Sequence, residues 1–166
     1  MNTKNIVFLG IMLAIVMVLS IVEQMLPPLP LLPPTVRIGL SNIVVMYCAF
    51  FVNFRSAVTL NILKAVFVFL TRGPIAGLLS LCGGMLSIAI IILLIVIFKN
   101  KISYSAVSVA GACFHNLGQF AAVYFLLALP HFLYYLPVLL LSGLGVGLLT
   151  GTLLKVTIPA FNRIPR

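Results

Sequence analysis

Hydrophobic residues run almost without a break along this chain, and polar or proline residues interrupt them at only a few places. The interruptions leave six apolar segments, which we expect to be membrane-spanning helices. The segments are Ile6–Leu26, Ile38–Val52, Ala57–Leu70, Ile75–Phe98, Tyr104–Leu129 and Phe132–Val156. The second and third segments are shorter than the roughly 20 residues that a level crossing requires. They either extend into their polar flanks or cross incompletely.

The joints between segments are rich in proline or polar residues. They lie at 27–34, 53–56, 71–74, 99–101 and 129–131. Because proline cannot propagate a helix, the stretch Pro27–Pro34 predicts an extended loop or cap at the membrane surface.

Composition supports a membrane protein. The 166 residues are 63% hydrophobic and 7% charged, with a mean hydropathy of +1.32, whereas about a quarter of the residues in a soluble domain are charged. The first segment is too long for the core of a signal peptide, so we take it as the first span. We therefore predict an all-α, compact bundle of six transmembrane helices, forming one domain over residues 1–166 in the cell membrane.

The basic residues predict an orientation, because Lys and Arg concentrate in cytoplasmic loops. With the N-terminus in the cytoplasm, seven of the ten Lys and Arg residues lie inside. They are Lys4, Arg55, Lys99, Lys101, Lys155, Arg163 and Arg166. The opposite orientation places only Arg37, Arg72 and Lys64 inside. Both chain ends are therefore expected in the cytoplasm (N-in, C-in).

Three cations remain on the predicted outer side. Arg37 opens the second segment, Arg72 follows the third, and Lys64 lies within the outer half of the third. Glu23, near the end of the first segment, is on the same side and is a candidate counter-ion. A charge at membrane depth is costly unless it is paired or faces a polar cavity. Lys64 therefore either contributes to a binding pocket, extends its ammonium to the interface, or pairs with Glu23.

Polar uncharged side chains collect at a similar depth. They are Asn42, Asn61, His115, Asn116 and Gln119. Each could serve only as a hydrogen-bonding contact between helices. Together with Arg37, Lys64 and Arg72, they predict a polar cavity with a cationic rim in the outer half, suited to a small anionic molecule. These eight residues are the candidate substrate-binding residues.

Carboxylates are almost absent, because Glu23 is the only acidic side chain and there is no Asp. The three cysteines, Cys48, Cys82 and Cys113, show no metal-ligand spacing with His115. We expect no metal site, no catalytic residues and no covalently bound cofactor. No phosphate-binding loop of the Walker type is present, so any use of ATP would require a partner ATPase.

Small residues form a second pattern. Gly10 and Ala14 are four residues apart, a spacing that lets another transmembrane helix approach closely. Further small residues occur in the fourth and sixth segments, where tight internal packing is the simpler explanation. Gly10 and Ala14 are therefore the candidate docking residues for a partner protein.

Four stretches resemble a known family. VRIGLSNIV (36–44), NILKAVF (61–67), the TRGP turn (71–74) and GACFHNLGQ (111–119) are similar to the Gx transporter family, also known as heptaprenyl diphosphate synthase component I. That family is in turn similar to the S components of energy-coupling factor (ECF) transporters, six-helix receptors for vitamins and metals. This resemblance implies that Gly10 and Ala14 contact a transmembrane coupling subunit driven by an ATPase pair, although the usual first alanine is Gly10 here. It also implies that Pro27–Pro34 cap the substrate pocket.

The two family names imply different functions. A prenyl diphosphate synthase needs aspartate-rich clusters that hold magnesium, and this chain has none. We therefore expect a noncatalytic protein: an S-component-like subunit of an ATP-driven uptake transporter that binds a vitamin-like or flavin-like molecule from outside. The alternatives are a noncatalytic membrane subunit of isoprenoid or quinone synthesis, and a membrane anchor of a flavin-dependent electron-transfer system.

Overall fold

The apolar segments form helices, as the hydrophobic pattern predicts. A computed structural model describes residues 3–25, 40–99, 102–126, 134 and 136–161. Within these residues the chain forms no strand and six helices: α1 (Thr3–Met25), α2 (Leu40–Phe51), α3 (Phe54–Arg72), α4 (Pro74–Phe98), α5 (Tyr104–Leu126) and α6 (Leu136–Phe161). All except α2 are long and apolar enough to cross a membrane. The predicted all-α, six-helix architecture of a multi-pass membrane protein is confirmed.

The third helix is longer than predicted, because its polar flanks are helical. Asn53 caps its N-terminus, where the side-chain oxygen accepts a hydrogen bond of 2.7 Å from the backbone N–H of Ser56. Gly73 ends the helix with a φ of 91°, a conformation that glycine adopts without steric cost. The α2–α3 and α3–α4 connections are therefore much tighter than the predicted four-residue joints. With 19 residues, α3 can span a membrane, whereas α2 has 12 described residues.

The remaining helix ends differ from the prediction by a few residues. α1 begins at Thr3, α4 takes Pro74 into its first turn, and α6 continues past Val156. Proline is tolerated in a first turn because its missing N–H would have no partner there. Several predicted boundaries and joints lie outside the described residues: Leu26, Pro27–Pro34, Ile38, Leu129 and 130–132.

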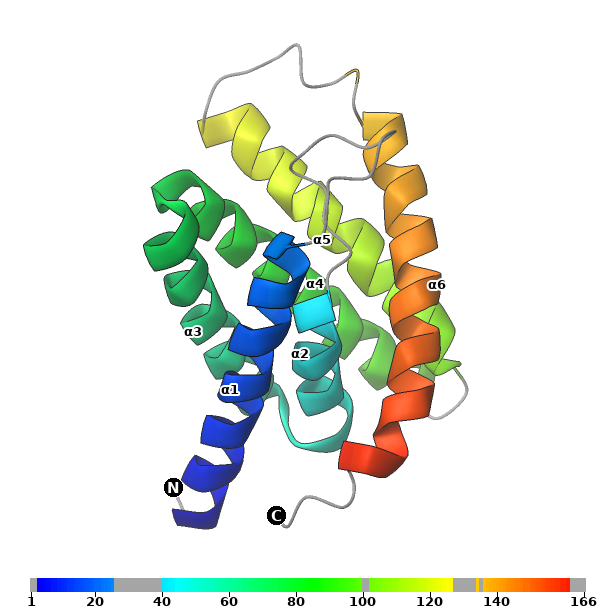
Figure 1. Cartoon of the computed structure of the whole chain (residues 1–166). Helices are drawn as coiled ribbons and strands as arrows, with labels where there is room; N and C mark the ends of the chain where they lie inside the picture. The colour runs from blue at the N-terminus through cyan, green and yellow to red at the C-terminus, as the bar shows by residue number, and fades with distance from the viewer. Residues whose placement is uncertain (1–2, 26–39, 100–101, 127–133, 135, 162–166) are drawn as a thin grey trace.

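The helices form a bundle in which the start of α1 and the end of α6 lie at the same end (Figure 1). α2 packs against α1, α3, α4 and α6, so the shortest helix is central. α5 packs against α4 on one side and α6 on the other. This arrangement fits the N-in, C-in orientation, which stays a prediction.

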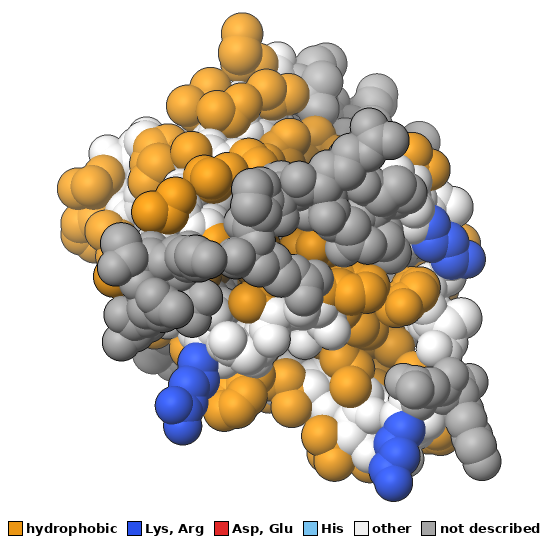
Figure 2. Space-filling model, turned by 90° about the horizontal axis from the view of Figure 1, so that it is seen from below, with side chains coloured by type: hydrophobic (Ala, Val, Ile, Leu, Met, Phe, Trp, Pro, Cys, Tyr) orange, Lys and Arg blue, Asp and Glu red, His pale blue; other side chains and the backbone are white. Residues whose placement is uncertain are grey.

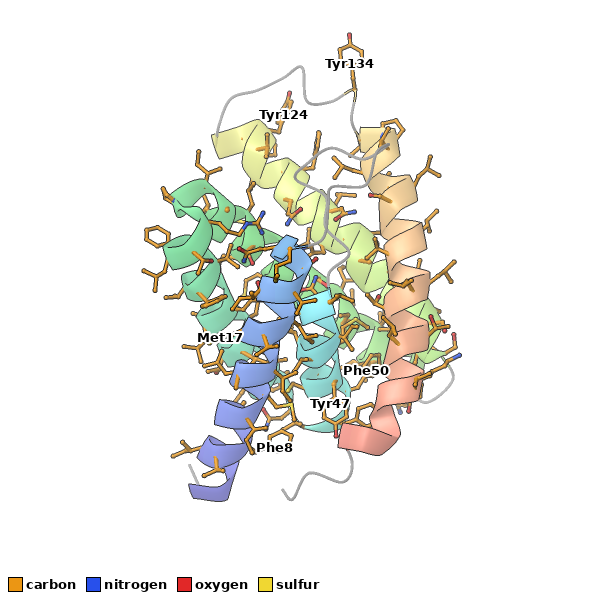
Figure 3. All side chains as sticks on the ribbon, in the orientation of Figure 1. Phe8, Met17, Tyr47, Phe50, Tyr124 and Tyr134 are labelled. Atoms are coloured by element: carbon orange, nitrogen blue, oxygen red, sulfur yellow. The ribbon has the colours of Figure 1, made fainter. Side chains whose placement is uncertain are left out.

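Apolar side chains fill the half of the bundle that holds the chain ends. Phe8, Tyr47 and Phe50 lie in this half (Figure 3), where Phe8 and Tyr47 belong to the buried core and Phe50 is partly buried against that core. Met12 and Val16 follow Phe8 at four-residue intervals and are fully buried. The outer surface at this end is mainly hydrophobic with separated Lys or Arg side chains (Figure 2). Among buried polar side chains, this half holds Ser56, Ser108 and Thr150, whereas Glu23 and Lys64 are buried in the other half.

Glycines of α6 bring it close to α5. A Cβ atom on Gly147 would lie 2.5 Å from the Cα of Val109, and one on Gly151 would lie 3.0 Å from the Cα of Ser105. Beside this contact the buried hydroxyls of Ser108 and Thr150 are 2.8 Å apart. Internal packing therefore accounts for these small residues, as expected, whereas Gly145 has no atom near its Cβ position.

Candidate ligand-binding cavity

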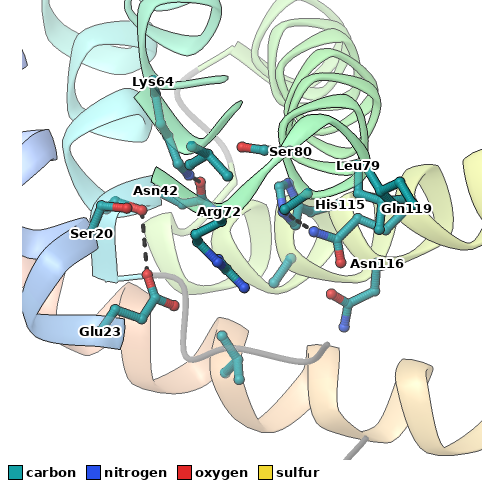
Figure 4. Close-up of a pocket in the computed structure, with 16 residues that line it drawn as sticks. Ser20, Glu23, Asn42, Lys64, Arg72, Leu79, Ser80, His115, Asn116 and Gln119 are labelled. Carbon is teal, nitrogen blue, oxygen red and sulfur yellow. Dashed lines mark hydrogen bonds between the residues drawn. The ribbon is translucent and has the colours of Figure 1, made fainter. Parts of the chain in front are cut away.

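A polar cavity of about 300 Å³ lies between the helices (Figure 4). It is in the half of the bundle away from the start of α1 and the end of α6, because Glu23 lies near the end of α1 and Arg72 at the end of α3. Side chains from all six helices line it. The lining consists of Ser20, Glu23, Ser41, Asn42, Lys64, Val68, Arg72, Ile75, Ala76, Leu79, Ser80, Ala112, His115, Asn116, Gln119 and Val146. Its size is at the lower end of the range for small-molecule sites, which is roughly 300 to 1,000 Å³.

Charged groups come from α1 and α3. Glu23 is buried, and its Oε2 accepts a hydrogen bond of 3.4 Å from the Ser41 hydroxyl. Lys64 is only 5% exposed, and its Nζ donates to Oδ1 of Asn42. The helix α3 carries Lys64 and, two turns later, Arg72. The guanidinium of Arg72 points into the cavity between Glu23 and Asn116 (Figure 4).

The α5 side of the cavity carries uncharged polar groups. His115 and Gln119 are one turn apart, and their Nε2 atoms lie 3.2 Å from each other. Asn116 is buried and donates through Nδ2 to the Leu139 carbonyl at 2.8 Å and to the Ser142 hydroxyl at 3.3 Å. These contacts fix the orientation of the Asn116 amide, because a carbonyl oxygen can only accept.

Most of the predicted substrate-binding residues are thus brought together in one cavity. Six of the eight line it, together with the proposed counter-ion Glu23: Asn42, Lys64, Arg72, His115, Asn116 and Gln119. Arg37 lies outside the described residues. Six of these side chains therefore lie in one cavity, while the ligand-binding role of each residue stays a prediction.

Asn61 is the residue that the structure separates from the cavity. It is fully buried, and a Cβ atom on Gly84 of α4 would lie 1.9 Å from its Oδ1. Neither polar atom of its side chain has a hydrogen-bond partner within the described part of the chain. Asn61 lies three residues before Lys64, but it contacts α4 instead of lining the cavity.

Three serines of the lining were not among the sequence candidates. Ser20 is one turn before Glu23 on α1, Ser41 precedes Asn42, and Ser80 lies in the second turn of α4. Two of these serines could have been identified from the sequence. Ser20 has a helical spacing to Glu23, and Ser41 is adjacent to Asn42. Ser80 is one of the small residues of the fourth segment, for which internal packing is the simpler explanation.

The candidate docking residues lie away from the cavity. Gly10 and Ala14 are exposed on the outer face of α1, and no atom lies within 4 Å of the position of a Cβ on Gly10. The spacing thus produces an unobstructed strip on this helix. For metal binding, the described residues contain no group of three or more His, Cys, Asp or Glu side chains, and Cys48, Cys82 and Cys113 are free thiols.

A match to a family model that covers most of the sequence shows to which family the chain belongs. The family model described as heptaprenyl diphosphate synthase component I matches residues 12–157. The chain belongs to this family. All cavity-lining residues of this component I protein lie within the matched stretch, whereas Gly10 precedes it. Neither the curated proteins nor the solved structures include a match. The synthase component I part of the resemblance is thus confirmed, and the similarity to ECF S components stays a prediction.

Proposed function

We propose that this protein is a noncatalytic, substrate-binding membrane subunit that holds a small anionic molecule in its polar cavity. The observation that carries the proposal is the position of Lys64 and Arg72, which line a cavity within an otherwise apolar bundle. Charged groups at membrane depth are unfavourable unless they have a polar partner or function. An anionic ligand would add a charged partner to the polar contacts that these cations make within the bundle.

The charge of the lining favours an anion over a cation. Among the described lining residues, Lys64 and Arg72 are cationic and Glu23 is the only acid. The Glu23 carboxylate offsets one of the two cations, which leaves one positive charge to attract a ligand. Serine and amide side chains add the hydrogen-bonding groups that orient a polar molecule in a small pocket.

In the proposed mechanism, this subunit binds its ligand from the outside, and a partner supplies the energy for uptake. The cavity lies at the end of the bundle away from the predicted cytoplasmic chain ends, so in the N-in, C-in orientation it belongs to the outer half. A single acidic side chain in the whole chain argues against ion-coupled transport, which generally uses acids within the membrane. We therefore assign this protein the role of an S-component-like subunit of an ATP-driven uptake system.

The strip at Gly10 and Ala14 supports docking of a transmembrane partner. Both residues are exposed on α1, and small residues permit close contact between helix backbones. The strip lies toward the start of α1, near the predicted cytoplasmic side, and away from the cavity. A coupling subunit with an ATPase pair could bind there without blocking the ligand.

The family assignment favours one further candidate function. The family description names one component of a prenyl diphosphate synthase, which implies work with a second subunit. In that function this chain would be a noncatalytic membrane subunit of isoprenoid or quinone synthesis, and its cations would contact a diphosphate group. Catalysis would belong to the other subunit, because this chain lacks the aspartates that hold magnesium.

Native mass spectrometry of gently extracted protein separates these functions, because it detects ligand and partner together. The transport function predicts a retained small anion and co-purification of a membrane subunit with an ATPase pair. A retained prenyl compound, together with a soluble synthase subunit, would favour the second function. Recovery of the chain with no ligand and no partner after extraction into native lipid particles would contradict both.

A further inference from the structure

The two sides of the cavity differ in the hydrogen-bonding groups that they offer. On the α5 side, both N–H groups of Asn116 are used, one by the Leu139 carbonyl and the other by the Ser142 hydroxyl. The Ser142 hydroxyl in turn donates to the Leu139 carbonyl at 2.8 Å, so it can only accept from Asn116. Asn116 therefore presents its Oδ1 to the cavity (Figure 4).

Gln119 adds a second acceptor on this side. The Nε2 of His115 lies 3.2 Å from the Nε2 of Gln119. Because an amide nitrogen can only donate, the imidazole Nε2 is the acceptor and the Gln119 amide is the donor. The Oε1 of Gln119 then remains for the cavity, and it points there in Figure 4.

The opposite side of the cavity offers donors from α2 and α3, beside the carboxylate of Glu23. The Lys64 ammonium has three N–H groups, donates one of them to Asn42, and can offer the other two to a ligand. Because Asn42 accepts through Oδ1, its free amide group is the donor Nδ2. Arg72, whose guanidinium has only donors, lies between this side and α5 (Figure 4). Apolar side chains also line the cavity, among them Val68, Leu79 and Ala112.

We propose that the cavity recognises a bipolar molecule, with a single negative charge at one end and an N–H donor at the other. The inference rests on the proposed function and narrows its substrate class. The anionic end contacts Lys64 and Arg72, and the N–H end donates to Asn116 Oδ1 and Gln119 Oε1. A ligand without the donor would displace water from these two oxygens and leave them unpartnered, which is unfavourable in a desolvated site.

Three probes of nearly equal shape test the two ends separately. 4-Aminobenzoate has both groups, 4-methylbenzoate replaces the amine by a methyl group, and 4-aminobenzamide replaces the carboxylate by a neutral amide. Each is titrated calorimetrically into the protein in lipid nanodiscs, with empty nanodiscs as the blank. We expect 4-aminobenzoate to bind about tenfold more tightly than either of the others, because each of the others loses the polar contacts of one end.

Two variants test which residue binds each end of the ligand. Gln119→Met should reduce the affinity for 4-aminobenzoate several-fold and leave that for 4-methylbenzoate unchanged, and the unchanged value shows that the variant is folded. Arg72→Gln should weaken both benzoates equally and leave 4-aminobenzamide unaffected. Arg55 lies in the first turn of α3, at the end opposite Arg72. The control variant Arg55→Gln should change none of the affinities.

The outcomes also separate this inference from the proposed function. Equal binding of the two benzoates, with both dependent on Arg72, would overturn the bipolar ligand and leave anion binding intact. If 4-aminobenzamide binds as tightly as 4-aminobenzoate, the anionic end is wrong. If no probe binds at millimolar concentration, or none depends on Arg72, both the inference and the proposed function are contradicted.

Discussion

Lys64 is a charged side chain in the middle of a transmembrane helix, and it has polar neighbours. It is nearly fully buried, its ammonium donates to Asn42, and it lines the same cavity as Glu23 and Arg72. Its ammonium thus has polar contacts within the bundle and need not reach the membrane interface. This contact requires α2 and α3 to be adjacent, which the sequence alone does not show.

Asn61 shows a different use of a polar residue within a helix. A methyl group on Gly84 would overlap its Oδ1, so Gly84→Ala should lower the stability by about 1–3 kcal/mol. Asn61→Ala in the same chain removes the overlap and should restore most of the loss. The melting temperature in mild detergent, followed by circular dichroism, measures both effects.

The control for this pair is Gly145→Ala, because no atom lies near the Cβ position of Gly145. It should leave the melting temperature unchanged or slightly higher, since alanine favours a helix over glycine. If Gly84→Ala is as stable as the wild type, or if Asn61→Ala gives no recovery, the close α3–α4 contact is wrong.

The cavity residues could be predicted because polar side chains are rare in this chain. Lys64, Arg72 and His115 are conspicuous between apolar residues, and the structure brings them together. The sequence does not distinguish Asn61 from the cavity residues, because Asn61 and Lys64 have a spacing that places them on the same side of a helix. Only the structure shows that Asn61 contacts Gly84 of α4. Sequence spacing shows which residues share a face, but not which helix that face meets.

At the scale of helices, the length of α3 follows from its two ends. A hydrophobicity count stops at Ala57 and Leu70, because the adjoining residues are polar. Hydrogen bonding extends the helix through these residues, from the cap at Asn53 to the turn at Gly73. Capping residues therefore determine the boundaries of α3. Asn53 and Gly73 can be recognised in the sequence as capping residues, but a hydrophobicity pattern does not take them into account.

The outer face of α1 carries the prediction for partner binding. Gly10→Leu places a large side chain on the strip at Gly10 and Ala14 and should abolish co-purification of the transmembrane partner. Ligand retention should be unchanged, because Gly10 does not line the cavity. Pull-down of a tagged chain, followed by mass spectrometry, measures the partner and the ligand in one sample.

The matched control is Gly145→Leu, which enlarges an exposed glycine on α6. It should leave the partner bound. A Gly10→Leu chain that retains every partner would show that docking uses another surface, although the cavity would be unaffected by that result.

At the scale of the whole molecule, polar and apolar groups are separated along the bundle. The apolar core lies toward the start of α1 and the end of α6, and the cavity lies toward the other end. The sequence predicted this division through the basic loops and the outer position of Lys64 and Arg72. The dimensions of the cavity and its division into donor and acceptor sides could not be predicted, because they depend on how α5 and α6 orient the Asn116 amide.

Cysteine labelling tests the orientation that makes the cavity face outward. Tyr134, at the end opposite the start of α1, is 84% exposed, and Lys155 is exposed near the end of α6. A membrane-impermeant maleimide should label Tyr134→Cys in intact cells and Lys155→Cys only after permeabilisation. The wild-type chain, which has three cysteines of its own, gives the background. The reverse pattern would place the cavity on the cytoplasmic side.

The central claim is that the cations of the cavity bind an anionic molecule, and the affinity of Arg72→Gln tests it most directly. The compound retained by the wild-type protein is identified and titrated back into ligand-free wild-type, Arg72→Gln and Arg55→Gln proteins. Loss of a charge-assisted hydrogen bond of about 1.5–3 kcal/mol predicts a decrease in affinity of about 10- to 100-fold for Arg72→Gln. The control Arg55→Gln should bind as the wild type does. Equal affinity of all three proteins would contradict the account.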